Sequence, residues 1–409
     1  MNTVLFPYGD DALPVTFDES DATVHLIDSA THVSKGRPLS EAISHPLGTP
    51  NLQQIIDGKR VAVILPDITR KMPISMPPFI IPYLRGAKEV RFIFGLGLHR
   101  KMSNTEEKTV LGNLEGSDVD YRVEQHDPNT CTYIGTTLYK TPLSVYTPVV
   151  EADVRIAIGR VDYHYYAGFT GGYKAILPGV SSKESILANH RLMMEDGALP
   201  GKLDGPVRKD IDSTRKLLPI DFLLNIVVAG GKIVHSASGD PILAHRDACA
   251  YLDSNMRVNL PFADVAVVSA GGNPKDINLF QAHKALENVQ GAIKRGGAVI
   301  LIAKCPEGMG NDVFSRWVHK GLEPDEVISK LKEKFEFGGH KLARLAMLRK
   351  RFELYLISDL PDDIAEGCYF TPCTSVEEAM EMALRNRKLQ NRKNVIAVRS
   401  GDLLLNGIT

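Results

Sequence analysis

The chain has 409 residues, more than one hydrophobic core usually serves, so we expect two domains. Its 48 basic and 49 acidic residues leave a formal net charge of -1, which offers no electrostatic footprint for nucleic acid or an anionic membrane and favours a small-molecule ligand. Five cysteines, an odd number scattered without CxxC spacing, argue against a disulfide framework and against a thiolate zinc site.

The beginning of the chain lacks the basic and apolar regions of a signal peptide, and no stretch is apolar enough to span a bilayer. We therefore expect a cytoplasmic protein. Short apolar, β-branched runs then predict buried strands at residues 61–67, 90–95 and 154–159. Capping-box spacing predicts that helices begin near Ser103 and Ser181. Two apolar runs that meet at Gly230 and Gly231 predict a β-hairpin attached to this sheet.

A second α/β unit is expected after residue 258. Its predicted strands cover residues 263–270, 298–304, 353–357 and 395–398. The alternation of strands and helices in both halves predicts an α/β protein with two doubly wound domains. The expected boundaries are 1–258 for a cofactor-binding domain and 259–394 for a second domain, while the tail 395–409 could end the second domain or return to the first.

Polar side chains follow each strand expected in the first unit. Asp67, Thr69 and Arg70 follow the first strand, His99 the second and His164 the third. Because ligands bind beyond the carboxyl ends of strands in open α/β sheets, we expect these loops to converge on one crevice. Arg70 is a candidate carboxylate clamp, since a planar guanidinium grips a carboxylate through two hydrogen bonds. The two histidines together indicate acid–base chemistry, although each alone is as often a structural histidine.

The run of residues 164–179, HYYAGFTGGYKAILPG, holds the most distinctive pattern in the chain. Gly168, Gly171 and Gly172 remove side-chain bulk and let backbone amides approach a ligand closely, which is typical of a cofactor cradle. Lys174 follows among glycines and apolar residues. Such surroundings favour the neutral, nucleophilic amine over the solvated ammonium.

Three further residues carry a weaker signal. His190 lies in the helix expected after Ser181, where a lone histidine more often packs than binds metal, and the chain has no HxxxH or HExxH spacing. Any metal at this position would need ligands from outside the protein. Gln281 and Lys284 are three residues apart on one predicted helix and so share a face, which by itself indicates an ordinary exposed surface.

Taken together, these motifs resemble the lactate racemase family. In chain order they are Asp67-x-Thr-Arg70, Gly97-x-His99-Arg100, His164-x4-Phe169-x-Gly171-Gly172-x-Lys174, Asn189-His190 and Gln281-x-x-Lys284. The resemblance runs through most of the chain in matching order. It implies an active site in a cleft between the two domains, completed when the domains close.

The resemblance also implies a cofactor. In that family it is a nickel pincer nucleotide, a pyridinium-3,5-bisthiocarboxylic acid mononucleotide, joined covalently to a lysine that corresponds to Lys174. His190 would be the one protein ligand to nickel, and the cofactor would supply most of the coordination sphere. Asp67, Thr69 and the three glycines of the loop would hold the nucleotide.

The family mechanism implies racemisation or epimerisation at C2 of a 2-hydroxy acid by hydride transfer. His99 and His164 would each serve as the base for one enantiomer. Arg70 and Lys284 would hold the substrate carboxylate, and Gln281 would add a polar contact. Closure of the domains would exclude water from the reaction.

The substrate and two other functions stay open. Phe280 stands where we expect tyrosine in lactate-specific members, so the substrate is lactate or a longer 2-hydroxy acid. Lys174 also suits an enzyme that forms a Schiff base with a carbonyl substrate, and the glycine-rich loop suits a non-catalytic nucleotide-binding protein. Expected partners are the substrate and the proteins that make the cofactor, without nucleic acid or membrane, and the small net charge permits a homo-oligomer.

Overall fold

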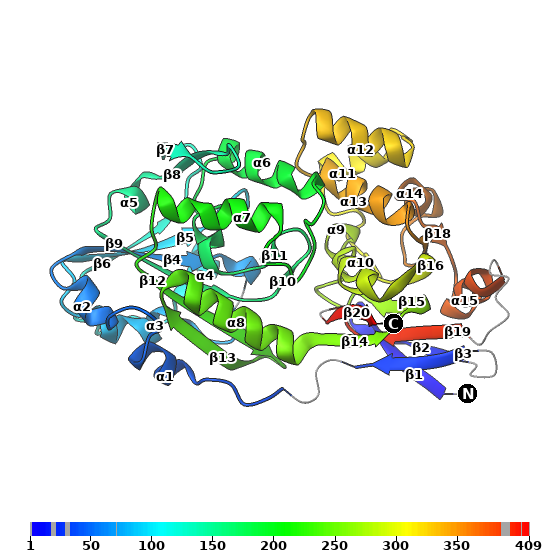
Figure 1. The fold of residues 1–409 in the computed structure, drawn as a ribbon, viewed down its shortest axis with the longest axis horizontal. Helices are drawn as coiled ribbons and strands as arrows, with labels where there is room; N and C mark the ends of the chain where they lie inside the picture. Colours follow the sequence, from blue (N-terminus) through cyan, green and yellow to red (C-terminus); the bar gives the residue numbers. More distant parts are fainter. Residues whose placement is uncertain are drawn as a thin grey trace. The chain divides into compact units, whose positions relative to one another are not determined.

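The computed structural model describes residues 2–17, 22–28, 33–70, 72–385, 393–401 and 403–408. The chain forms two compact units (Figure 1). The first contains residues 32–255, and the second combines residues 1–31 with residues 256–409. Each unit is built around a six-stranded sheet with helices packed on it, which confirms the predicted α/β class.

The sheet of the first unit has the order β13-β12-β9-β4-β5-β6, in which only β13 runs antiparallel to its neighbour. β12 and β13 form the predicted hairpin. The strands are β4 (Arg60–Pro66), β5 (Glu89–Gly95), β6 (Tyr121–Gln125), β9 (Val154–Arg160), β12 (Phe222–Ala229) and β13 (Lys232–Gly239). Two small antiparallel pairs stand outside it: β7 (Cys131–Thr136) with β8 (Pro142–Tyr146), and β10 (Tyr163–His164) with β11 (Gly168–Phe169).

The side chains of β4 are buried on both faces of the sheet, as is typical of a strand in a parallel sheet. Val61, Val63 and Leu65 belong to a core shared with helices α1 (Leu39–Ser44), α2 (Leu52–Ile56) and α3 (Pro77–Ile80), while Ala62 and Ile64 are buried on the opposite face. Successive side chains of a strand alternate between faces, so a strand buried on both reads as a continuous apolar run. Such a run made this strand predictable from the sequence.

Helices and short 3₁₀ turns (η) cover this sheet. The helices are α1 (Leu39–Ser44), α2 (Leu52–Ile56), α3 (Pro77–Ile80), α4 (Asn104–Leu111), α5 (Thr147–Val150), α6 (Lys183–Arg191), α7 (Pro206–Ser213) and α8 (Pro241–Met256). The turns are η1 (Ile68–Arg70), η2 (Ile81–Leu84), η3 (Gly172–Ala175), η4 (Leu192–Met194) and η5 (Thr214–Lys216).

One of the two predicted helix starts is shifted by a residue. Ser103 caps α4 as predicted, in a capping box with Glu106. The cap of α6 is Ser182 instead of Ser181, because the Ser182 hydroxyl accepts the amide of Ser185. Ser181 is fully buried and donates its hydroxyl to the carbonyl of Ile176, so it is not available as a cap.

The second unit contains a fully parallel sheet with the order β18-β17-β16-β15-β19-β3. Its strands are β3 (Ala22–Ile27), β15 (Ala263–Ser269), β16 (Ile293–Ile302), β17 (Glu353–Ile357), β18 (Thr371–Pro372) and β19 (Lys393–Val398). The hairpin β1 (Asn2–Tyr8) and β2 (Asp11–Phe17) buries Phe6, Val15 and Phe17 against this sheet. A further parallel pair joins β14 (Arg257–Pro261) to β20 (Leu404–Ile408).

The boundaries of the units differ from those expected. Residues 1–31 group with the second unit because β3 pairs with β19 and the hairpin β1–β2 packs on that sheet. The tail also stays in the second unit, since β19 lies between β15 and β3 and β20 pairs with β14. The first unit is therefore one continuous segment, whereas the second unit combines segments from both ends of the chain.

The helices of the second unit are mostly short. They are α9 (Leu279–Ala282), α10 (Lys284–Val289), α11 (Asp312–Val318), α12 (Pro324–Glu333), α13 (Gly339–Arg349), α14 (Asp362–Gly367) and α15 (Val376–Arg385), with one 3₁₀ turn η6 (Gln290–Ala292). Among the described residues, no helix has both the length and the apolar character needed to cross a bilayer.

Candidate active site

The loops that carry the predicted residues lie at one edge of the first sheet. β9, β4 and β5 are neighbours in that order and run parallel, so their carboxyl ends meet. Asp67 follows β4, His99 follows β5, and His164 lies in β10 shortly after β9. The amide of Gly97 donates to the carbonyl of Gly179 at 2.9 Å, which ties the loop after β5 to the end of the segment that holds Lys174.

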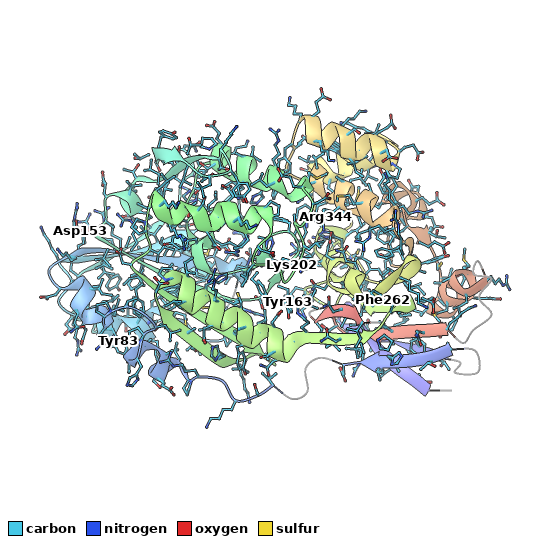
Figure 2. All side chains as sticks on the ribbon, in the orientation of Figure 1. Tyr83, Asp153, Tyr163, Lys202, Phe262 and Arg344 are labelled. Carbon is cyan, nitrogen blue, oxygen red and sulfur yellow. The ribbon has the colours of Figure 1, made fainter. Side chains whose placement is uncertain are left out.

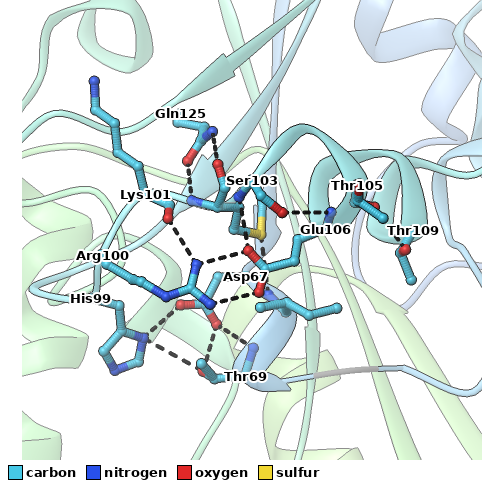
Figure 3. A network of polar contacts seen from close by, with 12 residues as sticks. Asp67, Thr69, His99, Arg100, Lys101, Ser103, Thr105, Glu106, Thr109 and Gln125 are labelled. Carbon is cyan, nitrogen blue, oxygen red and sulfur yellow. Dashed lines mark hydrogen bonds and ion pairs between the residues drawn. The ribbon is translucent and has the colours of Figure 1, made fainter.

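Asp67 is the centre of a polar network on this edge (Figure 3). One carboxylate oxygen lies 2.6 Å from Nδ1 of His99, and the other accepts the hydroxyl of Thr69 at 2.6 Å and its amide at 3.0 Å. Burial alone raises the pKa of Asp67, but hydrogen bonds from His99 and Thr69 and the positive charge of Arg70 outweigh it and leave this pKa below its usual value. The ionised carboxylate thus stabilises the fold at neutral pH, and this contribution is lost as the pH falls through the lowered pKa.

The backbone beside His99 is held by the start of α4. The guanidinium of Arg100 makes two hydrogen bonds to the carboxylate of Glu106, at 2.7 and 2.8 Å, and Glu106 also accepts the amide of Ser103 (Figure 3). The hydrogen bond from Arg100 lowers the pKa of Glu106 to about 2. Arg100 is therefore occupied in fixing the loop, while the side chain of His99 is half exposed.

The aromatic ring of Tyr166 brings together the three residues that the resemblance assigns to the base, the tether and the metal ligand. Its centroid lies 4.4 Å from that of His164 and 5.2 Å from that of His190, and Nζ of Lys174 lies 5.7 Å from it. Nζ of Lys174 is also 3.4 Å from Nε2 of His164. These four side chains come from β10, its following loop, η3 and α6.

Electrostatics favours the neutral forms of Lys174 and His190. Burial of the amine, together with the positive charges of Arg208 and Arg70, lowers the pKa of Lys174 well below its ordinary value. Burial is the largest cause that lowers the pKa of His190, to about 3. Arg70 also acts on Asp67, so the two groups of predicted residues lie within electrostatic reach of one guanidinium. A neutral amine is a nucleophile, and a neutral imidazole is a metal ligand.

The hydrogen bonds of His164 assign its tautomer. The amide of Ala167 donates to Nδ1 at 3.3 Å, so the proton of the neutral ring lies on Nε2. Nε2 can then donate to Lys174 only if that amine has a free lone pair, which agrees with its lowered pKa. His99 has the opposite arrangement, because its Nδ1 donates to the Asp67 carboxylate and its proton-accepting nitrogen is Nε2.

The three glycines are required by protein packing. A Cβ at Gly168 would lie 1.8 Å from the carbonyl oxygen of Lys202, and at Gly171 it would lie 2.7 Å from Oδ1 of Asn225. The amide of Gly172 donates to that same oxygen at 3.1 Å. Lys202 is labelled in Figure 2. The space beside these Cα atoms is thus filled by the protein, and a role of the glycines in holding a nucleotide stays a prediction.

Replacing Gly168 by alanine is expected to destabilise the first unit by about 2 kcal/mol or more. The φ angle is +74° and the added Cβ would overlap a backbone carbonyl, so the cost includes both strain and displacement of the main chain. Gly230→Ala is the matched control, because its φ is +54° and no atom lies within 4 Å of the added Cβ. Urea unfolding would measure both, and equal losses would contradict this interpretation.

Gln281 and Lys284 lie in the second unit, at the end of α9 and the start of α10. The ammonium of Lys284 donates to Oε1 of Gln281, which confirms that the two share a face. The helix expected to carry both is in fact two short helices separated by His283. Their contacts with a substrate, and that of Arg70, stay predictions.

Two contributors to this site were not predicted from the sequence. Neither Tyr166 nor Arg208 was among the candidate site residues. A second tyrosine directly after His164 was the available signal for Tyr166. Arg208 left no signal, because its hydrogen bonds within the loop go to backbone carbonyls.

Comparisons with known proteins give one consistent result. Residues 8–200 match the family model of the lactate racemase N-terminal domain, and residues 258–402 match that of the C-terminal domain. A lactate racemase of Thermoanaerobacterium thermosaccharolyticum is 28% identical over 97% of this chain and 97% of its own length. One from Lactiplantibacillus plantarum is 25% identical, covering 94% of this chain and 95% of its own.

Solved structures agree. The structure of the lactate racemase apoprotein from Thermoanaerobacterium thermosaccharolyticum aligns with a TM-score of 0.88 at 26% identity, covering 99% of this chain and 100% of that one. A protein from Thermotoga maritima aligns with a TM-score of 0.65 at 20% identity, which supports the fold alone. Its alignment covers 87% of this chain and 96% of that chain.

Proposed function

The chain belongs to the lactate racemase family and is an isomerase, and from this premise we propose that it inverts C2 of a 2-hydroxy acid with a nickel pincer nucleotide tethered to Lys174. The observation that carries the proposal is the cluster around Tyr166, in which His164, Lys174 and His190 all lie against one ring.

The residues present fit such a cofactor. The lowered pKa of Lys174 favours the neutral amine, which is the form that can make a covalent bond. His190 is buried and its lowered pKa keeps it neutral, as a metal ligand must be. One imidazole is a single donor, so the tethered group would supply the other nickel ligands. When bound, that group would accept the C2 hydrogen of the substrate as hydride and return it.

The two histidines would move the hydroxyl proton of the substrate. His99 presents Nε2 as a proton acceptor because Asp67 fixes its Nδ1–H, whereas His164 carries its proton on Nε2. One ring would therefore take a proton while the other gives one. The opposite enantiomer would use the same two rings with their roles exchanged.

The environment of Phe280 bears on the substrate. Its ring lies 6.4 Å from those of Phe314 and Phe337 and carries no hydroxyl. This position thus offers an apolar surface, and we propose a 2-hydroxy acid with a larger apolar side chain than lactate. A screen of 2-hydroxy acids for loss of optical rotation would identify it. Cytoplasmic location and partner proteins that make the cofactor stay predictions.

The proposal is tested by the intact mass of the protein purified from its native cell, with mapping of the peptide that contains Lys174. We expect a nucleotide-sized adduct that contains sulfur and nickel and is attached to Lys174. Active protein with an unmodified Lys174 would overturn the proposal.

One observation also favours a second function. A neutral amine at Lys174 is what an enzyme needs to form a Schiff base with a carbonyl substrate. If this function is correct, borohydride added with a keto acid would trap the Schiff base as a covalent adduct on Lys174. The protein purified from its native cell would then carry no nucleotide adduct. The racemase proposal expects no trapping, because Lys174 would already be bonded to the cofactor.

Asp67→Asn is expected to lower kcat by about 10²-fold with a small change in KM. The amide would keep the shape of the side chain but lose the carboxylate that accepts Nδ1–H of His99, so the ring would no longer be held with Nε2 as the acceptor. Steady-state rates with each enantiomer would measure the effect.

The control for this variant is Asp247→Asn. Asp247 forms a similar pair with His235, at 2.7 Å, in the same unit but outside the Tyr166 cluster. Its loss should leave kcat unchanged. A kcat for Asp67→Asn equal to that of the control would contradict the orienting role of Asp67.

A further inference from the structure

The guanidinium of Arg208 is fully buried and reaches into the loop that joins His164 to Lys174. It comes from α7 and donates to the carbonyls of Ala167, at 3.2 Å, of Gly171, at 3.5 Å, and of Phe169. These carbonyls belong to one loop, which turns at Gly168, where φ is +74° and the amide of Phe169 donates back to the carbonyl of Ala167 at 2.8 Å. One planar guanidinium therefore binds three carbonyls of this loop, which suits the rigid, planar arrangement of its N–H donors.

The intervening carbonyls are held from other elements. The carbonyl of Gly168 accepts the amide of Gly201 at 2.9 Å, and that of Thr170 lies 2.9 Å from Nε2 of His245. Every carbonyl from residue 167 to 171 thus has a hydrogen-bond partner. Although rich in glycine, this segment is held by hydrogen bonds from elements on both sides. The loop that begins at His164 therefore holds η3 and Lys174 in a fixed position.

The charge of Arg208 acts on the same lysine. Its guanidinium lies 3.3 Å from the carboxylate of Asp212, and its positive charge, with that of Arg70, disfavours the ammonium form of Lys174. The other groups that face the Lys174 amine are His164, at 3.4 Å, and the ring of Tyr166. Arg208 is therefore placed to influence both where this amine lies and how nucleophilic it is.

We propose that Arg208 is a positioning residue for the cofactor tether: by holding the carbonyls of residues 167–171, it fixes the Lys174 amine in place before the cofactor is attached. The proposal rests on the proposed function, since it requires a group that bonds to Lys174. It concerns the apoprotein, so part of it can be tested without cofactor or activity.

The first measurement is amide hydrogen exchange of the wild-type apoprotein. We expect the peptide covering residues 165–175 to be protected to about the same degree as the central strand β4, because amides such as those of Thr170 and Gly172 are hydrogen-bonded and the contacts of Arg208 oppose the opening that would expose them. Exchange as fast as that of the exposed turn at Gly230 and Gly231 would overturn the proposal, whatever the state of the cofactor.

The second measurement compares variants purified from cells that make the cofactor. Arg208→Gln removes the positive charge and the guanidinium, and Arg208→Lys keeps the charge but cannot donate to three carbonyls at once. In folded protein of either variant, we expect exchange of residues 165–175 to be at least about tenfold faster and the fraction carrying the Lys174 adduct to fall about tenfold or more. Asp212→Asn, which leaves the three carbonyl contacts intact, is the control and should match the wild type.

These readouts separate positioning from mere stabilisation. A stabilising role alone would lower the melting temperature but leave the adduct fraction of the folded protein unchanged. Folded Arg208→Lys with a wild-type adduct fraction would overturn the proposal even if Arg208→Gln fails to fold. If the wild type itself carries no adduct on Lys174, the proposed function fails instead, and hydrogen exchange still decides whether the loop is fixed.

Discussion

Lys174→Ala is expected to abolish the covalent adduct and racemase activity together. The amine of Lys174 is the group that would bond to the cofactor, and burial with two nearby guanidiniums lowers its pKa, which favours the nucleophilic neutral form. Alanine at this position offers no atom for the bond. Raising the substrate concentration should therefore not restore activity, because the defect lies in the attachment of the cofactor and not in substrate binding.

The effect should be specific to this lysine. Lys183 is exposed at the first position of α6 and close in sequence, so Lys183→Ala is a matched control that removes an amine without touching the Tyr166 cluster. Mass spectrometry and the rate of interconversion of the enantiomers would be measured on both variants. Retention of full racemase activity by Lys174→Ala would eliminate the tethered-cofactor mechanism.

The parts of the fold that were predicted are those in which local pattern and final structure agree. β4 is a nearly continuous apolar run because both faces are covered, and the polar residues after β4 and β5 lie at the carboxyl edge that a parallel sheet exposes. The convergence of Asp67 and His99 followed from that rule and is confirmed by their hydrogen bond.

The parts that were not predicted depend on distant partners. β3 is an edge strand that, within the described part of the chain, pairs with β19 near the other end of the sequence, and nothing local indicates that pairing. Arg208 was missed for a similar reason, since backbone carbonyls leave no motif in a sequence. The glycines were predicted to admit a ligand, whereas Lys202 and Asn225 occupy the space beside them, a difference only packing could reveal.

Replacing either His99 or His164 by alanine is expected to lower the rate of interconversion by about 10²- to 10⁴-fold in both directions. Inversion needs one ring to take the hydroxyl proton and the other to return a proton, so loss of either ring stops the full conversion from both enantiomers. The hydrogen bonds agree with this division, because His99 presents an acceptor at Nε2 and His164 a donor. The double variant should be little worse than either single one, since both act in one sequence of steps.

His235→Ala is the matched control for this pair. Like His99, His235 is bonded to a carboxylate, and like His164 it is buried, but it stacks on Tyr251 and lies on β13, away from the Tyr166 cluster. Its loss should lower stability while the folded protein keeps its kcat. The fixed equilibrium between enantiomers requires kcat/KM to fall equally in the two directions, so the size of the loss, measured from each pure enantiomer, is what tests the prediction. Full activity of either variant would reject that histidine as a base.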